Sequence, residues 1–503
     1  MPDVFYVLTY MFYISIYILL FINIHKLFGS NMEKIKNSMM KVIELKLRVL
    51  KKAISLNSEY SACLIGGLII ALAMVNFGLF GGKEAYHHIV HTPWVDWKIL
   101  GHTINLHFVA NDIFMTFFFA IAAVEVKQAL LPGGDLDSKK KAGVPFFGFL
   151  GGVFGPIGVF LLILFVLKQT QFSNGWGIPT ATDIAIAWFF AKKIFGEFHP
   201  AVTFLVVVAV LDDFAGMGII AVAYPNPNYP VDLGALWIVA IGISVCFIFN
   251  RIYELNRIYE LNKVTVKNKY LDTFFGNYWL YLIIGGTLSW VGLIQANLHP
   301  ALALVPVVFC MPSRKIEKQH MFEISKKESK KDSTTMTHFE HQFKHIVDIG
   351  LLSFTFANTG ISLSSVGVVT VAVALALLIG KTLGIYACTK FGLFLLKVKP
   401  KFGNKELFLL SMVASIGLTV AIFVSDQAFP GTTDANAQAK MGSIISVLYG
   451  IIALILGKLL KIEKITTKEE VEKANWYYLY WFTILIFTWD LITSVIRSLF
   501  LLS

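Results

Sequence analysis

The chain has little charge and little cysteine for its 503 residues. Asp, Glu, Lys and Arg make up 15% of it, whereas a soluble domain typically carries about 25%. We find no glycine-rich phosphate loop followed by Lys-Ser or Lys-Thr and no other enzymatic constellation, so no ATP-driven activity and no cofactor are expected. The four cysteines lie in or beside apolar runs without a pairing pattern, which favours buried thiols over disulfides or a metal framework; they are Cys63, Cys246, Cys310 and Cys388.

Apolar runs are what the chain has in abundance. Hydrophobic residues make up 56% of the sequence, and several runs reach the roughly 20 residues that cross a bilayer as a helix. The short alternating segments typical of a membrane β-barrel do not occur. The sequence predicts an all-α polytopic membrane protein with fourteen spanning segments near residues 4–25, 61–81, 108–129, 144–166, 180–191, 201–223, 233–249, 278–295, 299–311, 346–358, 367–388, 407–428, 441–457 and 476–500.

Lys and Arg are distributed unevenly between alternate connections. Thirty-six of them lie in one set, which comprises 26–60, 130–143, 192–200, 250–277, 312–345, 389–406 and 458–475. Only four lie in the alternate set, 82–107, 167–179, 224–232, 296–298, 359–366 and 429–440. Because basic loops stay on the cytoplasmic side, the first set is predicted to be cytoplasmic and both termini external. The net charge of +11 is therefore a topology signal, and no nucleic-acid partner is expected.

Residues 1–57 and 461–503 are predicted to be additions to a core at 58–460. The first apolar segment lacks the basic region and the small-residue cleavage site of a signal peptide, so we interpret it as a retained anchor. The basic stretch Asn31–Lys52 is either an amphipathic helix on anionic membrane lipid or a solvated connector. Residues 461–503 are interpreted as a cytoplasmic linker followed by an extra spanning helix.

Two adjacent carboxylates interrupt one of the apolar runs. Asp212 and Asp213 are the only charged residues between Ala201 and Tyr224. A single carboxylate at the centre of a membrane helix costs about 2.5–3.5 kcal/mol on insertion scales, so an adjacent pair calls for a functional reason. Neighbouring carboxylates also titrate as a coupled unit, and a cation that enters the site displaces protons from them. The pair therefore indicates a cation–proton pathway.

Two of the segments are interrupted. Pro179 and the small polar residues of 174–183 disfavour a continuous helix there. Small and polar residues also weaken the middle of 411–423, which reads SMVASIGLTVAIF. Interrupted segments in corresponding halves of a chain point to the midplane site of a transporter, where half-helix ends carry partial charges.

Asp183 and Lys381 are candidate partners for these half-helix ends. Asp183 directly follows the first interruption, and Lys381 lies inside the apolar run LALLIGKTLGIYA. A buried lysine needs a carboxylate beside it. The alternative is a snorkelling lysine whose ammonium group reaches toward the basic loop that begins about nine residues later.

Seven motifs follow one another in a fixed order within residues 58–460. They are NDIFMTFFFAIAAVEVKQALL (111–131), PTATDIAIA (179–187), LDDFAG (211–216), HPALALV (299–305), FTFANTGISL (354–363), LLIGKTLGI (377–385) and SIGLTVAIF (415–423). In this order they resemble the NhaA family of sodium–proton antiporters. The resemblance implies inverted repeats with two discontinuous crossing helices, in 12 core transmembrane segments plus one extra at each end.

The resemblance also implies roles for individual residues. Asp213 would be the main sodium ligand and proton carrier, and Asp212 the second carboxylate, paired with Lys381 when no sodium is bound. Thr182 would supply a further oxygen to the sodium ion. Asp183 would balance helix-end charge at the crossing.

Two more acidic residues match the family in supporting positions. Asp112 corresponds to a membrane acidic residue of the family's second helix. Glu125 corresponds to an acidic residue near the cytoplasmic funnel, where pH sensing is placed in the family.

The implied function is secondary active antiport, with sodium or lithium leaving the cytoplasm in exchange for protons across a bacterial inner membrane. Two titrating carboxylates and a lysine favour an electrogenic exchange that serves pH and sodium homeostasis. Three alternatives stay open: an antiporter for potassium or another monovalent cation, a non-transporting membrane sensor on the same scaffold, and a cation channel. The intact polar residues argue against the sensor, and paired carboxylates beside broken helices favour gated exchange over an open pore.

The external connection 82–107 has two further features. It contains His87, His88, His91 and His102, for which we favour a solvated loop over a metal site or a pH sensor. Its stretch Trp97–Val109 alternates around a glycine like a small hairpin. The resemblance implies that this hairpin lies at a homodimer interface.

Two cytoplasmic connections depart from an ordinary loop. Residues 251–262 contain the hexapeptide RIYELN twice, and we expect this duplication to extend a helix without a function of its own. Residues 312–345 are rich in Lys, Glu and Ser, which favours a flexible loop.

Overall fold

The computed structural model describes residues 62–95, 98–99, 102–131, 139–196, 199–224, 231–261, 270, 274–313, 334–398, 402–431 and 433–464. All of them belong to one compact unit, Ser58–Lys468, which is described by itself. The predicted segments 4–25 and 476–500, the stretch Asn31–Lys52 and most of the connection 312–345 lie outside the described residues.

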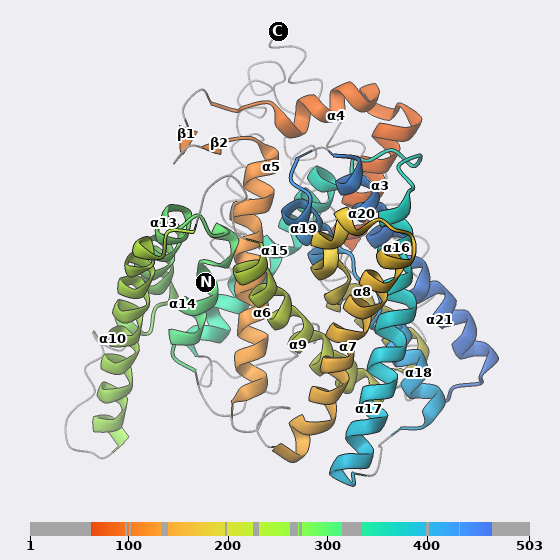
Figure 1. The fold of residues 1–503 in the computed structure, drawn as a ribbon. Coiled ribbons are helices and arrows are strands. Elements are labelled where there is room, and N and C mark those ends of the chain that lie inside the picture. Colours follow the sequence, from red (N-terminus) through yellow and green to blue (C-terminus); the bar gives the residue numbers. More distant parts are fainter. Residues whose placement is uncertain are drawn as a thin grey trace, which may run out of the picture. The chain divides into compact units, whose positions relative to one another are not determined.

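The described part of the chain is built almost entirely of helices (Figure 1). In chain order the elements are α3 (Ala62–Phe77), η1 (Leu79–Gly81), α4 (Gly82–His91), β1 (Lys98–Ile99), β2 (His102–Thr103), α5 (Leu106–Phe108), η2 (Val109–Phe114), α6 (Met115–Leu130), α7 (Lys139–Val166), η3 (Thr170–Thr180), α8 (Ile184–Phe195), α9 (Pro200–Ala223), η4 (Leu233–Ala235), α10 (Leu236–Leu261), α12 (Tyr278–Leu280), η5 (Tyr281–Gly286), α13 (Thr287–Gln295), η6 (Pro300–Leu302), α14 (Leu304–Cys310), α15 (Thr335–Asn358), α16 (Val368–Leu375), η7 (Ala376–Lys381), α17 (Thr382–Leu396), α18 (Asn404–Val413), α19 (Thr419–Ala428), α20 (Asp434–Ile445) and α21 (Val447–Leu459).

Seven helical stretches within the described ranges are long and apolar enough to cross a bilayer. A further pair, Cys63–Phe77 and Leu79–His91, bends by 87° and adds an eighth if it is counted as one span. The seven are Leu106–Leu130, Ala142–Val166, Pro200–Ala223, Leu233–Asn256, Tyr278–Gln295, Val368–Leu396 and Asp434–Leu459. The all-helical multi-pass prediction is confirmed, while the count of fourteen segments and the inverted repeats remain predictions.

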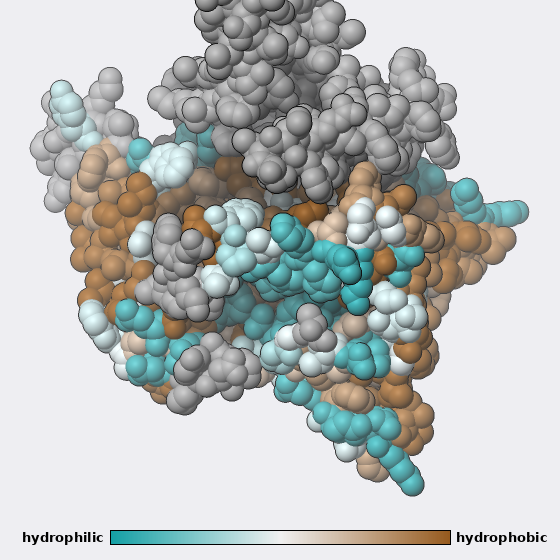
Figure 2. All heavy atoms as spheres, turned by 90° about the horizontal axis from the view of Figure 1, so that it is seen from above, coloured by the Kyte–Doolittle hydropathy of each residue, from teal (hydrophilic) through white to brown (hydrophobic). Residues whose placement is uncertain are grey.

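Apolar side chains cover the outer faces of these helices. Figure 2, which views the molecule from above, shows apolar residues along the flanks and hydrophilic residues gathered toward the middle of that face. On α10 the exposed large side chains include Trp237, Ile241 and Phe247, and on α17 they include Phe391 and Phe394. Lipid tails can cover such apolar faces. In water they would form large exposed apolar patches, which are rare on soluble proteins.

Helix α7 packs against η7 and α17 through glycines that have the same spacing on both partners. Gly151 and Gly155 on α7 face Gly380 and Gly384, and a Cβ added at Gly151, Gly155 or Gly384 would collide with a backbone carbonyl of the other partner. Two small residues four positions apart let membrane helices approach to backbone contact. Gly380, the residue directly before Lys381 in η7, therefore lies against the α7 backbone.

The predicted hairpin forms over fewer residues than expected, and the predicted helix runs through most of the duplicated hexapeptide. Strands β1 and β2 pair antiparallel, with Lys98 opposite Thr103 and Ile99 opposite His102. The hairpin is shorter than predicted, because a helical turn begins at Leu106. The helix α10 runs through the RIYELN repeats as far as Leu261.

Candidate functional site

Two interrupted segments cross at their breaks, in the centre of the described core. In the first segment, residues 181–183 are extended between η3 and α8. In the second, residues 414–418 separate α18 from α19. The amide of Asp183 donates a hydrogen bond of 2.7 Å to the carbonyl of Ile416, so the two breaks are joined backbone to backbone.

Local sequence explains why the breaks can meet. A Cβ added at Gly417 would lie 2.9 Å from the carbonyl oxygen of Ala181, so the close approach depends on glycine. Ser446 closes the other side of the second break, because its hydroxyl lies 3.1 Å from both the amide nitrogen and the carbonyl oxygen of Gly417. The backbone groups that the break removes from helical bonding are thus partly satisfied by other contacts.

Asp183 lies between the amino-terminal ends of two half helices. Its Oδ1 accepts a hydrogen bond of 3.1 Å from the Ile186 amide and caps α8. Its Oδ2 accepts hydrogen bonds from the amide and the hydroxyl of Thr419, the first residue of α19. Both helix ends carry partial positive charge, so one buried carboxylate stabilises both of them.

Asp212, Lys381 and Thr182 form a second cluster beside the crossing. The Nζ of Lys381 lies 3.0 Å from Asp212 Oδ2 and donates to the Thr180 carbonyl at 2.5 Å. The Thr182 hydroxyl lies 2.7 Å from the same Asp212 oxygen and 2.8 Å from the Ala414 carbonyl. A hydroxyl has one proton, so Thr182 donates to one of these acceptors at a time.

Lys381 is fully buried, which excludes the snorkelling alternative for it. Its ammonium group is held inside the protein by Asp212 and by the first broken segment, and it does not extend toward the basic loop. The π-helical turn η7, which ends at Lys381, locally widens the helix that carries it.

Two carboxylate oxygens in this cluster have no partner. Asp212 Oδ1 and Asp213 Oδ1 are both buried and accept no hydrogen bond from the described residues. The absence of a side chain at Gly152 leaves room beside Asp212, because a Cβ there would stand 3.3 Å from Oδ1. Buried carboxylate oxygens are costly unless a proton, a donor or a cation satisfies them. The pair therefore has the unsatisfied acceptors that a cation or protons would fill.

Known proteins match this chain over most of its length. The model of the Na+/H+ antiporter 1 family matches residues 51–457. The Na(+)/H(+) antiporter NhaA of Geobacter sulfurreducens is 40% identical over 417 residues, which are 83% of this chain and 100% of the relative. The chain belongs to the NhaA family.

Two other NhaA proteins agree with this membership. The Na(+)/H(+) antiporter NhaA of Desulfitobacterium hafniense is 42% identical over 418 residues, 82% of this chain and 98% of the relative. The one from Jannaschia sp. is 35% identical over 432 residues, 80% of this chain and 97% of the relative. The resemblance stated from the motifs is confirmed, and an NhaA protein is a multi-pass secondary transporter rather than an enzyme.

Five of the predicted NhaA site residues lie at or directly beside the crossing, whereas in the described part of the chain Asp112 and Glu125 are not bonded to it, although the charge of Glu125 acts on Asp213. Among the described residues, no hydrogen bond or ion pair joins the side chain of Asp112 or Glu125 to the crossing. Asp112 is half-buried in η2, and its backbone carbonyl accepts a 2.5 Å hydrogen bond from Thr116. Glu125 is buried on α6. Thr182 and Lys381 each contact Asp212 directly, and Asp183 and Asp213 are the next residues in the chain after Thr182 and Asp212.

Thr419 is a site residue that sequence reasoning did not identify as a partner of Asp183. The available signal is its position, because it is the first hydroxyl after the break of 414–418 and begins a half helix. Hydroxyl residues at such helix starts commonly join the capping contacts.

The histidines of the connection 82–107 do not make a metal centre in the described part of the chain, where no group of three or more His, Cys, Asp or Glu side chains is placed to hold an ion. The rings of His87 and His91 stack at 5.5 Å between centroids, and those of His91 and His107 lie 5.6 Å apart. Burial and the nearby charges of His87 and Lys440 lower the pKa of His91, an exposed residue at the end of α4. His91 therefore favours its neutral form at physiological pH.

Proposed function

We propose that this chain is an electrogenic antiporter that exports cytoplasmic sodium, and also lithium, in exchange for external protons. It would reside in the bacterial inner membrane and serve pH and sodium homeostasis. The relatives' printed names, Na(+)/H(+) antiporter NhaA, support the sodium and proton part of this proposal. The unpartnered buried oxygens of Asp212 and Asp213 are the single observation in the structure that carries it.

The donor set suits sodium, a hard cation that prefers oxygen ligands. We assign Asp213, Asp212 and Thr182 as the sodium-binding residues. Asp183 neutralises the half-helix ends around the ion, and Asp112 and Glu125 act as supporting acidic residues along the route. No resident cofactor and no ATP site are part of this proposal.

Exchange follows from competition at Asp212 and Asp213. Lys381 occupies Asp212 in the structure, so a sodium ion must displace its ammonium group, and it must also displace the proton that Asp213 carries. Sodium and protons therefore cannot be loaded together. If one sodium ion replaces more than one proton, each cycle moves net positive charge inward, which makes the exchange electrogenic.

Two further parts of the proposal rest on the chain's resemblance to its family. A homodimer through the external connection 82–107 is supported by the short β1–β2 hairpin, and membrane lipid would contact the apolar flanks. Potassium or another monovalent cation stays the alternative substrate, and a non-transporting sensor stays the alternative function.

Everted membrane vesicles from cells without their own antiporters test the proposal. The lumen is first acidified by respiration, and sodium, lithium or potassium is then added while a pH-sensitive dye reports proton release. We expect sodium and lithium to release protons from wild-type vesicles and to have no effect with Asp213→Asn. The matched control is Asp232→Asn, an exposed residue that caps η4 away from the crossing.

The other outcomes are equally informative. Proton release by potassium alone would favour the alternative substrate. Silent wild-type vesicles with verified insertion of the protein, across all cations and pH values, would overturn antiport and favour the sensor. Proton release that persists in Asp213→Asn would overturn the site assignment.

A further inference from the structure

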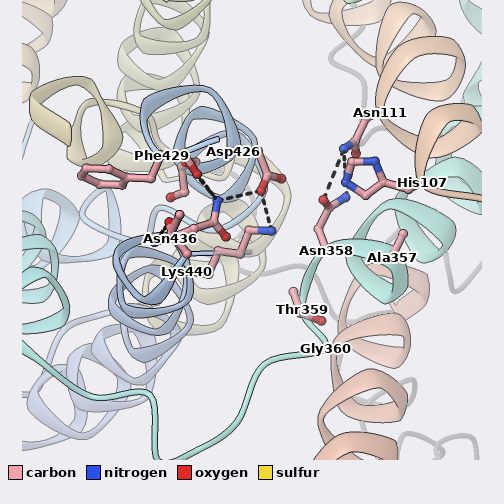
Figure 3. A network of polar contacts seen from close by, with 12 residues as sticks. His107, Asn111, Ala357, Asn358, Thr359, Gly360, Asp426, Phe429, Asn436 and Lys440 are labelled. Atoms are coloured by element: carbon pink, nitrogen blue, oxygen red, sulfur yellow. Dashed lines mark hydrogen bonds and ion pairs between the residues drawn. The ribbon is translucent and has the colours of Figure 1, made fainter. Parts of the chain in front are cut away.

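A second lysine–aspartate pair, with the lysine buried and the aspartate partly buried, lies at the far end of α19 from the crossing. Figure 3 shows this pair. The Nζ of Lys440 is 2.6 Å from Asp426 Oδ1, and the two side chains are 8% and 14% exposed. The amide group of Asn436 donates to the same carboxylate oxygen at 2.9 Å and to the Phe429 carbonyl at 2.9 Å. The second carboxylate oxygen, Asp426 Oδ2, is buried and accepts no hydrogen bond from the described residues.

This arrangement repeats that of the central site. In both places a buried lysine occupies one oxygen of an aspartate, at 3.0 Å for Asp212 and 2.6 Å for Asp426. In both places the other carboxylate oxygen is left without a donor. A purely structural ion pair is expected to have its remaining oxygen satisfied, because an unpaired buried acceptor destabilises the fold.

The outer pair is aligned with the crossing along one face of α19. Thr419, Phe423 and Asp426 have the spacing i, i+4 and i+7, which places them on the same face of a helix. Thr419 bonds Asp183 at the crossing. Thr419 and Asp426 are seven positions apart on the helix, a rise of about 10 Å.

Phe423 separates the two polar sites along this face. Its ring lies 5.5 Å from that of Phe119 and 4.7 Å from that of His299, between centroids, and the residue is fully buried. The face therefore has a polar site at each end and an aromatic cluster between them. A cation that crosses the cluster toward the outside would next meet Asp426.

Further polar groups face the outer pair from other elements (Figure 3). Asn111 of η2 and Asn358 of α15 bond to each other at 2.7 Å, and Asn111 Nδ2 lies 3.0 Å from His107 Nε2. The charges of Asp426 and Lys440 both act on the His107 ring, so these groups lie within electrostatic range. Carboxylate, amide and carbonyl oxygens are the ligands that a hard cation prefers.

We propose that Asp426 and Lys440 form a second, outer cation site, where a sodium or lithium ion replaces the lysine ammonium group on its way to or from the crossing. The inference rests on the proposed antiport function. It also uses the predicted external position of the connection 429–440, which is poor in Lys and Arg. The outer site would hold the ion briefly, because the lysine competes with it.

Single substitutions in the pair are expected to shift external affinity in opposite directions. Asp426→Asn leaves the lysine uncompensated, so the apparent KM for external sodium should rise about tenfold, which is the change expected from losing roughly 1.4 kcal/mol of favourable interaction. Lys440→Met leaves the carboxylate free for the ion, so the external KM should fall below the wild-type value. The neutral double variant, Asp426→Asn with Lys440→Met, should lie between the two single variants. If the ion pair were only structural, both single variants would break the same contact and would shift KM in the same direction.

The experiment compares the two faces of the membrane. Sodium-dependent proton movement is measured in right-side-out vesicles for the external KM and in everted vesicles for the cytoplasmic KM, with the amount of inserted protein quantified. We expect the cytoplasmic KM to change less than about twofold in every variant. Asp434→Asn, an exposed residue that begins α20, is the matched control and should leave both values unchanged.

Shifts of the same sign in the single variants, equal shifts on both faces, or no shift at all would overturn the outer site. If a single variant does not accumulate, Asp426→Glu provides a second test. A longer carboxylate on a cation site should change the ratio of external KM values for lithium and sodium, and an unchanged ratio counts against the site. Failure of antiport itself has a separate signature, because wild-type everted vesicles would then be silent.

Discussion

At the scale of single residues, the crossing is held by side chains that each satisfy more than one partner. Asp183 stabilises two half-helix ends. Thr182 lies between Asp212 and the Ala414 carbonyl, so it links the second broken segment to the carboxylate pair. Because each of these side chains has more than one partner, the loss of a single atom from it should disrupt several contacts at the crossing.

Removing the Thr182 hydroxyl tests its place in the sodium site. Thr182→Val keeps the shape of the side chain and loses an oxygen that lies 2.7 Å from Asp212. We expect the apparent KM for sodium to rise tenfold or more, because one hydrogen bond to a charged group is typically worth about 1.5–3 kcal/mol and about 1.4 kcal/mol corresponds to tenfold. Thr182→Ser, which retains the hydroxyl, is the control in everted vesicles. A KM that is the same in Thr182→Val and Thr182→Ser would show that the oxygen does not contact the ion.

Removing the Lys381 charge should weaken the folded state. Lys381→Met leaves Asp212 buried without its cation, and breaking a buried pair in this way costs about 3–5 kcal/mol. We expect a clearly lower midpoint of thermal unfolding for the purified protein in detergent. The double variant Lys381→Met with Asp212→Asn removes the stranded charge and should recover part of the loss. A midpoint that is unchanged in Lys381→Met would contradict the ion pair as a stabilising contact.

At the scale of elements, glycine spacing decides how closely α7 approaches η7 and α17. The side chains that line the site depend on this approach, because Lys381 ends η7 directly beside it. The glycine-rich stretch 147–158 is evident in the sequence. Which glycines make the contact follows only from the structure.

Enlarging a glycine in this contact should disrupt the fold. A Cβ at Gly155 would collide with the Gly380 carbonyl, so Gly155→Leu is expected to destabilise the protein by about 3 kcal/mol or more. Gly158→Leu on the same helix is the control, since a Cβ at that position meets nothing within 4 Å. The amount of inserted protein and its thermal unfolding in detergent are measured. Equal behaviour of the two variants would mean that α7 and η7 are not in backbone contact.

The first turn of α9, the helix that carries Asp212 and Asp213, should depend on pH through His199. Its Nδ1 accepts a hydrogen bond of 3.1 Å from the Ala201 amide. Burial lowers the pKa of His199, partly opposed by Glu406, so the folded state favours the neutral ring. Stability from this cap is therefore complete above the ordinary histidine pKa of about 6.5 and is lost as pH falls below it.

Hydrogen exchange measures this dependence. After correction for intrinsic rates, protection of the Ala201 amide is expected to decrease between pH 7.5 and 5.5 in the wild type. His199→Asn keeps a capping acceptor that does not titrate in this range, so its protection should stay constant. A wild-type protection that is flat across this range would contradict the role of His199 in the cap.

At the scale of the whole molecule, the charge asymmetry of the connections predicts the orientation in the membrane. Asp434 and Lys405 are both exposed and lie in connections of opposite predicted sides. In a background that lacks the four native cysteines, Asp434→Cys should react with an impermeant maleimide in spheroplasts. Lys405→Cys should react only in everted vesicles. The reverse pattern would invert the topology, and with it the external assignment of Asp426 and Lys440.

Much of the site was predictable because its residues can be recognised from the sequence around them, without knowing which residues they contact. Asp212 and Asp213 stand out in an apolar run. The first break was predicted within 174–183, and the structure has it at 181–183, just after Pro179, which lies inside η3. The break in 411–423 was predicted in the correct segment, with the non-helical residues at 414–418. The contacts of Thr419 and of Asp426 were not predictable, because their partners lie elsewhere in the sequence and an isolated Thr or Asp near a helix end has many ordinary explanations.

The sequence by itself determined that this protein crosses a membrane repeatedly and that it is an NhaA-type transporter, and it predicted five of the polar residues that the structure places at or beside the crossing. These conclusions follow from apolar length, charge placement and motif order, all of which are properties of the chain. Only the tertiary structure decided that Lys381 is buried against Asp212, that Asp183 serves two helix ends and that Asp426 and Lys440 form a second pair. Those facts are distances between residues remote in sequence, and packing of the helices, in particular the close glycine contact of α7, sets them.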